Sequence, residues 1–293
     1  MAFKSGFVNI IGKPNVGKST LMNALVGDKL SIITAKAQTT RHRILGIVNT
    51  EDAQIIYSDT PGIIKPHYKL QESMMRFVKD AYEDADVLLL MVEPKMTLES
   101  IEDIVKPFEN SKSHKILVIN KIDKLADEDE LIKTVDYWSK ALEVPVIIPI
   151  SALNKAHLDV LYEEIIKHIP EHPPFYPTDA FTDKPERFFI SEIIREKILL
   201  HYKEEIPYSV DVVIDAFKEE ENIIRISALI ITNKKSHKPI LIGKGGGMLK
   251  KVGTQARLDA EKFFGKKIFL EIYVKVKENW RDNDMMLRHL GYN

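Results

Sequence analysis

The segment Gly12-Lys13-Pro14-Asn15-Val16-Gly17-Lys18-Ser19, residues 12–19, decides the fold of the first half of the chain. It lies between the apolar run Phe7 to Ile11 and the helix-like run Thr20 to Val26. A strand, a glycine-bounded loop and a helix in this order are typical of a P-loop, in which backbone N–H groups face phosphate oxygens. We therefore expect Lys18 to contact the β- and γ-phosphates of a nucleotide and the Ser19 hydroxyl to contact Mg²⁺. The alternative, a tight turn that binds no ligand, is disfavoured by the flanking strand and helix.

Length and composition favour a two-domain globular protein. The chain has 293 residues, of which 44% are hydrophobic and 29% charged. No apolar run reaches the roughly 18 residues of a membrane-spanning helix, and the N-terminus lacks the apolar region of a signal peptide. We therefore expect a cytoplasmic protein. The absence of cysteine excludes disulfides, thiolate zinc sites and a cysteine nucleophile, and the nine histidines show no metal-ligand spacing.

The net charge of −1 hides an asymmetry between the two halves of the chain. Residues 1–186 carry 22 Lys and Arg against 28 Asp and Glu, whereas residues 187–293 carry 20 against 15. Within residues 233–275 the numbers are 11 against 3. A basic block confined to one domain is either a solvated face or the footprint of a nucleic-acid partner.

A second phosphate-binding element follows the P-loop. The strand-like run Gln54 to Ser58 leads into Asp59-Thr60-Pro61-Gly62. In P-loop nucleoside triphosphatases a carboxylate at this place holds Mg²⁺, and the backbone N–H of the following glycine contacts the γ-phosphate. We therefore predict these roles for Asp59 and Gly62.

The base of the nucleotide is selected later in the chain. The apolar runs Val87 to Val92 and Lys115 to Ile119 read as buried parallel strands, and the second ends in Asn120-Lys121-Ile122-Asp123. The Asp123 carboxylate can accept from guanine N1–H and the 2-amino group together, whereas adenine would leave it unpaired. Asn120 would hold the loop and reach N7, and the Lys121 stem would cover the base. The alternative is a helix-capping turn.

A last strand, Val144 to Ile150, precedes Ser151-Ala152-Leu153, whose N–H groups we expect at guanine O6. Together with the run Ile44 to Val48, these strands predict an α/β domain. It would hold a mostly parallel six-stranded sheet with helices on both faces.

Five prolines between Ile169 and Pro185 predict an extended, stiff linker. We therefore divide the chain into a G domain at 1–170, a linker at 171–186 and a second domain at 187–293.

The second domain shows the element order of a type II KH domain, an α+β fold. An amphipathic helix, Phe188 to Lys203, is followed by two strands, a G-x-x-G loop and a last strand. The stretch from Pro239 to Ile242 reads as an apolar strand that enters the loop, and two helices leave it. The remaining elements are expected at Ser209 to Phe217, Ile223 to Thr232, Met248 onward, Ala256 to Phe264 and Lys267 to Val276.

The G-x-x-G loop suits single-stranded RNA, because glycines allow close approach to the sugar-phosphate chain while lysines supply charge. An apolar groove beside Ile240 and Ile242 would receive the bases. Gly247 makes a third consecutive glycine, so the clamping pair is uncertain by one position. The predicted RNA-binding residues are Ile242, Gly243, Lys244, Gly245, Gly246, Lys250 and Lys251. The alternative is a tight turn between helices in a domain that binds something else.

The C-terminal stretch from Trp280 to Tyr292 predicts a short helix. Trp280, Met285, Met286 and Leu290 would pack against the second domain.

These motifs, together with Lys36-Ala37-Gln38-Thr39-Thr40-Arg41-His42-Arg43, resemble the Era family of bacterial GTPases over nearly the whole chain. The resemblance implies that residues 31–44 are switch I and that residues 59 to about 79 are switch II. Thr40, with Thr39 as second choice, would close on Mg²⁺ and the γ-phosphate. It also implies that Asn15 is a ligand for K⁺, which could supply charge during hydrolysis.

Ile63 stands where related enzymes place a water-orienting glutamine, so we expect slow intrinsic hydrolysis that K⁺ or RNA stimulates. For Arg41 and Arg43 we favour surface or RNA contacts over a role as an arginine finger. The predicted catalytic groups are Lys18, Thr40 and Gly62. The predicted Mg²⁺ ligands are Ser19, Thr40 and Asp59. The predicted nucleotide-binding residues are Gly12, Asn15, Val16, Gly17, Lys18, Ser19, Thr20, Asp59, Gly62, Asn120, Lys121, Asp123, Ser151, Ala152 and Leu153.

The resemblance implies a monomeric GTPase switch, with GTP, GDP and Mg²⁺ as ligands, that binds the 3′ end of 16S ribosomal RNA during 30S subunit maturation. Two alternatives remain. One is an RNA-binding scaffold whose G domain scarcely hydrolyses GTP. The other is a peripheral GTPase whose basic face meets anionic lipid at the cytoplasmic face of the inner membrane.

Overall fold

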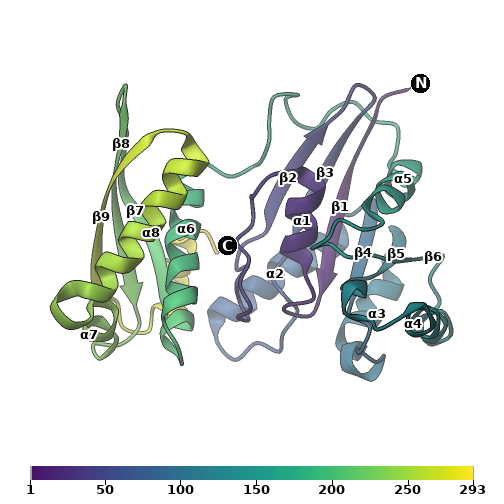
Figure 1. The fold of residues 1–293 in the computed structure, drawn as a ribbon, viewed down its shortest axis with the longest axis horizontal. Helices are drawn as coiled ribbons and strands as arrows, with labels where there is room; N and C mark the ends of the chain where they lie inside the picture. The colour runs from purple at the N-terminus through teal and green to yellow at the C-terminus, as the bar shows by residue number, and fades with distance from the viewer. Residues whose placement is uncertain (1, 293) are drawn as a thin grey trace. The chain divides into compact units, whose positions relative to one another are not determined.

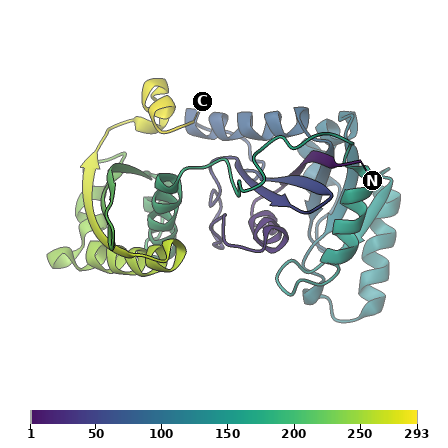
Figure 2. The same ribbon diagram turned by 90° about the horizontal axis from the view of Figure 1, so that it is seen from above.

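The computed structural model describes residues 2–292, and these fall into two compact units (Figures 1 and 2). The first runs to Lys65 and resumes from Met74 to Asp183, and the second consists of Pro66–Ser73 and the chain from Lys184 onward. Among the described residues, no helix has the length and apolarity that crossing a bilayer requires.

A six-stranded sheet forms the centre of the first unit, in the order β2-β3-β1-β4-β5-β6. Only β2 runs antiparallel to its neighbour, so the expectation of a mostly parallel six-stranded sheet is confirmed. The strands are β1 (Lys4–Gly12), β2 (Ile44–Asn49), β3 (Ala53–Asp59), β4 (Val87–Val92), β5 (His114–Ile119) and β6 (Val146–Pro149).

Helices cover both faces of this sheet (Figure 1). On one face, residues of α2, α3 and α4 share an apolar core with the sheet, including Val78, Phe108 and Trp138. On the other face, α1 packs so closely on β2 that a Cβ at Gly46 would lie 2.6 Å from Met22 and Val26. The helices are α1 (Lys18–Val26), α2 (Lys69–Glu83), α3 (Glu102–Asn110), α4 (Glu128–Ala141) and α5 (Leu158–His168), with 3₁₀ turns η1 (Glu99–Ile101) and η2 (Ile122–Lys124).

The centre of the sheet explains the apolar strands of the sequence. All six residues of β4 are buried, because this strand has a hydrogen-bonded neighbour on each side and a packed layer on each face. A strand in that position gains from an apolar side chain at every residue rather than at every second one. The carboxyl ends of β1, β3 and β5 then carry the predicted site residues.

The proline-rich segment forms no helix or named strand between Ile169 and Pro185, contains a turn at residues 178–179, and is hydrogen-bonded to the first unit. Ile47 N–H donates to Phe181 O at 3.0 Å, and Leu45 N–H donates to Asp183 Oδ1 at 3.0 Å. The Thr182 hydroxyl donates to Leu45 O at 2.7 Å. These bonds pair the outer edge of β2, which would otherwise expose unpaired backbone groups.

The second unit is a three-stranded sheet, β7-β8-β9, with α6 and α8 packed on it (Figures 1 and 2). β7 and β8 are antiparallel, whereas β8 and β9 are parallel. The predicted type II KH fold is confirmed. Its elements are α6 (Glu186–His201), η3 (Ile206–Tyr208), β7 (Val210–Glu219), β8 (Ile223–Thr232), α7 (His237–Ile242), η4 (Lys244–Gly246), α8 (Gly247–Phe264), β9 (Lys267–Val276), η5 (Trp280–Asp282) and α9 (Asp284–His289).

Two local predictions for this unit are wrong. Residues 239–242 belong to the helix α7 rather than to a strand, because Pro239 stands in the first turn, where its missing N–H costs nothing. Burial of Leu241 next to the half-exposed Ile240 holds this turn against the core. The two predicted helices after the loop are one helix, α8. Gly253 lies inside it, where a Cβ would just touch Ile272 on β9.

The C-terminal segment also differs from its prediction. Trp280 is fully buried and its indole N–H donates to Ser209 O at 3.1 Å, as a packing role requires. Met285, however, is 81% exposed, and Leu287 and Tyr292 are the residues that pack. The Tyr292 hydroxyl donates to the buried Asp211 carboxylate at 2.7 Å, a polar anchor that helical spacing alone does not indicate.

Candidate functional site

The loop between β1 and α1 leaves the first turn of α1 open to an anion. Gly17 at its N-cap has φ of 105°, supplies no side-chain cap, and is followed by no acidic residue in the first turn. A Cβ at Gly17 would lie 2.2 Å from Asn120 Nδ2, so both this contact and the backbone conformation exclude a side chain at position 17. The N–H groups of the first turn and the positive end of the helix dipole therefore remain for a ligand.

Lys18 is buried beside this loop and its ammonium is held by backbone oxygens. Lys18 Nζ donates to Gly12 O at 3.1 Å and to Lys13 O at 3.0 Å. Burial lowers the pKa of Lys18 to about 8, although the nearby Asp59 carboxylate acts in the opposite direction. A cation with so little solvation is suited to a ligand that brings several negative charges.

Three oxygen-bearing side chains from three different segments meet next to Lys18. The Ser19 hydroxyl donates to Asp59 Oδ2 at 2.7 Å and lies 2.9 Å from Thr40 Oγ1, and Thr40 donates to the same carboxylate oxygen at 3.2 Å. Ser19 is the second residue of α1, Thr40 precedes β2 and Asp59 ends β3. The fold thus brings together the three residues predicted as Mg²⁺ ligands.

The Asp59 carboxylate is suited to a metal ion. Burial raises its pKa, while Lys18 and the hydroxyl donors Ser19, Ser31 and Thr40 act against that rise. Its Oδ1 atom is buried and has no hydrogen-bond partner among the described residues. Carboxylate and hydroxyl oxygens are the protein ligands that Mg²⁺ prefers. The residues present therefore fit Mg²⁺.

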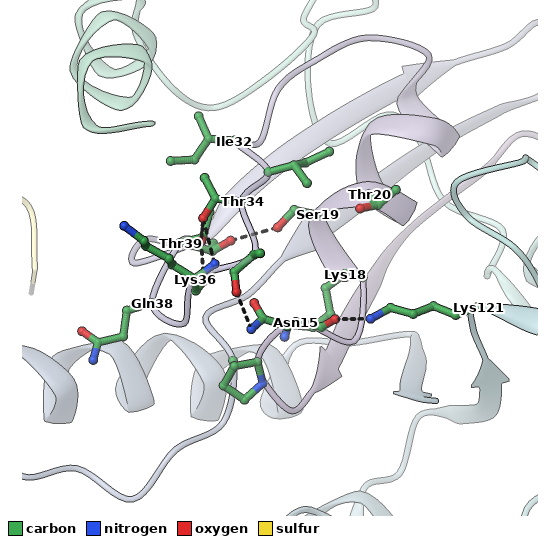
Figure 3. A pocket seen from close by; sticks show the side chains of 16 residues that line it. Asn15, Lys18, Ser19, Thr20, Ile32, Thr34, Lys36, Gln38, Thr39 and Lys121 are labelled. Carbon is green, nitrogen blue, oxygen red and sulfur yellow. Dashed lines mark hydrogen bonds between the residues drawn. The ribbon is translucent and has the colours of Figure 1, made fainter. Parts of the chain in front are cut away.

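A cavity of about 320 Å³ opens over these residues (Figure 3). Figure 3 shows Lys18, Ser19 and Thr20 from α1 on one side of it and Thr34, Lys36 and Thr39 of the switch I segment on the other. Of the predicted residues, the cavity is lined by Asn15, Gly17, Lys18, Ser19, Thr20, Thr40, Gly62 and Lys121. Gly12, Val16, Asp59, Asn120, Asp123 and residues 151–153 are not among its lining residues.

Four of the lining residues lie outside the quoted motifs. Ile32, Ile33, Thr34 and Ala35 come from the segment between α1 and β2. The resemblance places these residues in switch I, but no pattern in the segment indicates which side chains face inward.

The predicted base-binding residues are bonded to one another and to the P-loop. Asn120 Nδ2 donates to Val16 O at 2.8 Å, and Asn120 Oδ1 accepts from Ala152 N–H at 2.9 Å. Lys121 Nζ donates to Asn15 O at 2.6 Å and to the Glu93 carboxylate. Asn120 therefore holds the loop as predicted, because it joins the P-loop to the segment after β6.

Asp123 and the Ser151–Leu153 segment also lie together. The Ser151 hydroxyl donates to Asp123 Oδ1, which fixes one carboxylate oxygen. In this state Ser151 N–H donates to Ala156 O, and Ala152 N–H is bonded to Asn120. A contact from these N–H groups to guanine O6 would require those bonds to be shared or exchanged.

The two arginines of switch I are not free for RNA. Arg41 is completely buried. Arg43 pairs with Asp84 at 2.6 Å and donates to Ser58 Oγ and Asn9 Oδ1, at 2.7 and 3.1 Å. The expectation of surface or RNA contacts is therefore wrong for Arg41, which is buried, whereas Arg43 is partly exposed and makes its ion pair with the exposed Asp84.

Ile63 follows the predicted switch II glycine and packs into the core below the sheet. Its side chain is only 9% exposed, and its N–H donates to Gly12 O at 3.1 Å. An alkyl group in that position cannot orient a water molecule. Asn15, the predicted K⁺ ligand, has φ of 65° and donates from Nδ2 to Ala35 O at 3.0 Å, which leaves its Oδ1 for a cation.

In the second unit, the glycine loop connects α7 to α8. Gly243 (φ 74°, ψ 174°) and Gly246 (φ 78°, ψ 6°) adopt conformations that side chains disfavour, whereas Gly247 (φ −61°, ψ −38°) is ordinary helix. A Cβ at Gly243 would also lie 2.8 Å from Met248. The backbone therefore requires glycine at 243 and 246 but not at 247.

A groove of about 370 Å³ lies beside this loop, between α8 and β9. Neither Ile240 nor Ile242 lines it, so the predicted apolar groove beside these residues is not the cavity that the fold forms. Lys244 and Lys251 are exposed but do not line the groove. The groove is lined by Gly246, Leu249, Lys250, Gly253, Thr254, Arg257, Leu270 and Ile272.

Arg257 is the basic groove residue that the motif did not predict. It lies seven residues after Lys250 on α8, so both side chains project from one face of the helix. That spacing, with small residues at 253 and 254 between them, was the available signal. It acquires meaning only once residues 247–264 are known to form one helix.

Comparisons with known proteins agree with both halves of the chain. The family model described as a 50S ribosome-binding GTPase matches residues 7–121, and the model described as a KH domain matches residues 205–281. The GTPase Era of Syntrophus aciditrophicus (strain SB) is 49% identical over 295 residues, which covers 99% of this chain and 96% of that protein.

Two solved structures are similar over 99% of both chains, at 41% identity and a TM-score of 0.92. One is Era in complex with MgGDPNP and nucleotides 1506–1542 of 16S ribosomal RNA. The other is a variant of Aquifex aeolicus Era bound to GDP and AlF4−.

Proposed function

Since this chain belongs to the Era family of GTPases, we propose that it is a GTP-dependent switch that binds the 3′ end region of small-subunit ribosomal RNA. The reaction is hydrolysis of GTP to GDP and phosphate. One observation supports the nucleotide half most directly: Ser19, Thr40 and Asp59 converge, and Asp59 keeps a buried oxygen that has no hydrogen-bond partner within residues 2–292. Such an oxygen needs a cation, which Mg²⁺ supplies when the nucleotide binds.

Within that site, Lys18 would place its charge against the β- and γ-phosphates. Thr40 would fix the switch I segment next to the γ-phosphate, and the Gly62 N–H would contact the same group. These three residues are proposed as the catalytic groups. Ser19, Thr40 and Asp59 would hold Mg²⁺ during the reaction, which spreads the negative charge of the transferred phosphoryl group.

Asp123 and Asn120 would select guanine. Asp123 Oδ2 is available for the N1–H and 2-amino group once Oδ1 has accepted from Ser151. Gly12, Val16, Gly17, Thr20 and Leu153 complete the proposed nucleotide site by backbone contact. The Lys121 stem would lie along the base.

The second unit would bind the RNA through Gly243 to Gly246, Lys250 and Lys251, with Ile242 beside the loop. Support comes from the exposed lysines and from the groove next to the required glycines.

Family membership supports a role in 30S maturation, and we propose that the protein is cytoplasmic and monomeric. The proposed domains remain 1–170, a linker at 171–186, and 187–293. Residues 66–73 lie inside the proposed switch II yet group with the second unit, which suggests a route from nucleotide state to RNA affinity.

The role of K⁺ at Asn15 is tested by measuring GTP turnover in matched KCl and NaCl. We expect faster turnover in KCl, and a much smaller salt preference in Asn15→Ala. Equal turnover in both salts would contradict the K⁺ site without affecting the Mg²⁺ site.

The whole proposal is tested by the GTPase rate of the purified protein with Mg²⁺, with and without a short RNA copied from the 3′ end of 16S ribosomal RNA. We expect the RNA to raise the rate. The rise should disappear when Gly243 and Gly246 are both replaced by Asp, because the backbone can no longer approach the sugar-phosphate chain. Gly247→Ala is the matched control and should keep the rise.

Two other outcomes would favour the alternatives. Tight RNA binding without any change in rate would favour an RNA-binding scaffold, for which the buried Ile63 is the best argument. Flotation of the protein with anionic liposomes, undiminished by competing RNA, would favour a peripheral membrane GTPase.

A further inference from the structure

Two histidines and a glutamate meet at the edge of the first unit opposite the nucleotide cavity. His114 begins β5, and Glu164 and His168 lie one turn apart at the end of α5. The rings of His114 and His168 are stacked, with centroids 3.3 Å apart and 7° between their planes. Their in-plane lone pairs therefore run parallel, and the exposed His168 ring must turn before both can face a common point. Because the P-loop follows the carboxyl end of β1, the amino-terminal end of β5 faces the other way in this parallel part of the sheet.

We propose that His114, Glu164 and His168 bind a divalent transition metal of the zinc class. One nitrogen of each histidine and one carboxylate oxygen of Glu164 all lie within 4.8 Å of one another. His168 Nε2 is 3.0 Å from Glu164 Oε1, and His114 Nε2 is 3.9 Å from the same oxygen. Two ligand atoms on a tetrahedral Zn²⁺ are about 3.4 Å apart, given metal–ligand bonds of about 2.0–2.1 Å. The observed separations lie on either side of that value.

His114 supplies the observation that a plain surface cluster does not explain. Its Nε2 is buried and has no hydrogen-bond partner among residues 2–292. An imidazole nitrogen ligates a metal through its lone pair, and this nitrogen has no competing hydrogen bond among the described residues.

The ligand set also decides which metals fit. Imidazole nitrogens favour Zn²⁺ and its transition-metal neighbours over Mg²⁺, which prefers oxygen. Glu164 Oε2 pairs with Lys167 at 3.1 Å, so Oε1 remains for the metal. His168 and Lys167 are exposed, which gives an ion access from solvent and lets the lysine withdraw. A fourth position would be taken by water.

A bound ion would add a link between two parts of the first unit, because His114 Nε2 has no hydrogen-bond partner among the described residues. It would connect the start of β5 to the last turn of α5, just before the proline-rich segment. The 50-residue separation of His114 and Glu164 explains why spacing in the sequence did not indicate a metal site.

The test is titration of Zn²⁺ into the full-length protein in metal-free buffer, with GDP and excess Mg²⁺ present to occupy the nucleotide site. Calorimetry and thermal melting are the two readouts. We expect one Zn²⁺ per chain and a higher melting temperature. Glu164→Gln and His168→Phe should each weaken Zn²⁺ binding at least about tenfold. Phenylalanine at 168 keeps a ring stacked on His114, so packing is preserved.

Glu163→Gln on the exposed side of the same helix, and His172→Ala in the following segment, are the matched controls and should bind Zn²⁺ as the parent does. Equal affinity in all five proteins, or no stoichiometric binding in the parent, would overturn the proposal. If a variant fails to fold, the visible spectrum of Co²⁺ bound to the parent decides. An intense tetrahedral band supports the site, and the weak spectrum of an octahedral aqua ion contradicts it.

Discussion

Lys18 carries a charge that its surroundings stabilise poorly in the ligand-free protein. Its side chain is 6% exposed and burial lowers its pKa to about 8, from 10.5 for a free lysine. A pKa that is lower in the folded state than in the unfolded state means that the protonated lysine opposes folding at neutral pH. The site is thus less stable than it would be with an apolar residue, as binding sites commonly are.

We therefore predict that Lys18→Met stabilises the ligand-free protein by on the order of 1–3 kcal/mol at pH 7. Removal of the lowered pKa contributes about 1.4 kcal/mol for each pKa unit, and the loss of the two hydrogen bonds from Lys18 to backbone oxygens subtracts from that gain. The difference should shrink as pH rises from about 8 to about 10.5, because over that range the unfolded parent binds more protons than the folded one. Denaturation followed by Trp138 fluorescence in a Trp280→Phe background measures both. Retained GTP affinity in the variant would contradict the assigned role.

Asp123 gives a prediction about base selectivity. Asn in its place can donate to a 2-oxo group but cannot accept from two N–H groups. We expect Asp123→Asn to lose at least about 100-fold in GTP affinity and to gain affinity for xanthosine triphosphate. Competition binding with the two nucleotides measures the ratio. Asp127→Asn is the control, because Asp127 caps α4 by accepting from Glu130 N–H and has no proposed part in the base site.

At the scale of elements, the four glycines at 243, 245, 246 and 247, at and before the start of α8, have different backbone requirements. Gly243 lies in a region of φ and ψ that is essentially restricted to glycine, and Gly247 lies in helix. We predict that Gly243→Ala destabilises the second unit by about 1–3 kcal/mol. Gly247→Ala should stabilise it by about 0.4–1 kcal/mol, because only the unfolded chain loses freedom.

The two tryptophans allow this comparison to be made on the second unit alone. Trp280 is buried in that unit and Trp138 in the first, so Trp280 fluorescence in a Trp138→Phe background reports the unfolding of interest. Equal destabilisation by both alanine variants would show that the loop conformation differs from the one described.

At the scale of the whole molecule, charge is divided between the two halves of the chain. The first half is acidic and the second is basic, although the net charge is close to zero. Binding of single-stranded RNA should therefore weaken with salt, by about 0.7 in the log–log slope for each phosphate contacted. We predict that Lys250→Gln lowers the slope by about that amount, measured by fluorescence anisotropy from 50 to 300 mM KCl, a range of about sixfold.

Lys262 on the same helix is the control for this prediction. It is exposed, lies twelve residues beyond Lys250, and does not line the groove. Lys262→Gln should leave the slope unchanged. An equal change in both variants would mean that the RNA responds to the total charge of the unit and not to the groove.

The motifs determined the nucleotide chemistry because each acts through residues that are close in sequence. Gly12 to Ser19 fold locally into a loop and helix start. The run before Asp59 predicts a strand, and the run before Asn120 predicts a strand buried on both faces. These strands are parallel, so their carboxyl ends meet at one edge, and the fold and most of the candidate nucleotide site followed from the sequence.

Only the tertiary structure decided what depends on partners distant in the chain. The arginines at 41 and 43 look alike in the sequence, but the fold buries Arg41 completely and leaves Arg43 partly exposed in an ion pair with Asp84. Residues 239–242 suit a strand or a helix, and packing of Leu241 selected the helix. His114 and His168 acquire a common carboxylate only because α5 ends beside the start of β5. Local patterns determine which residues can form an element, whereas the long-range contacts of the folded chain determine what each side chain meets.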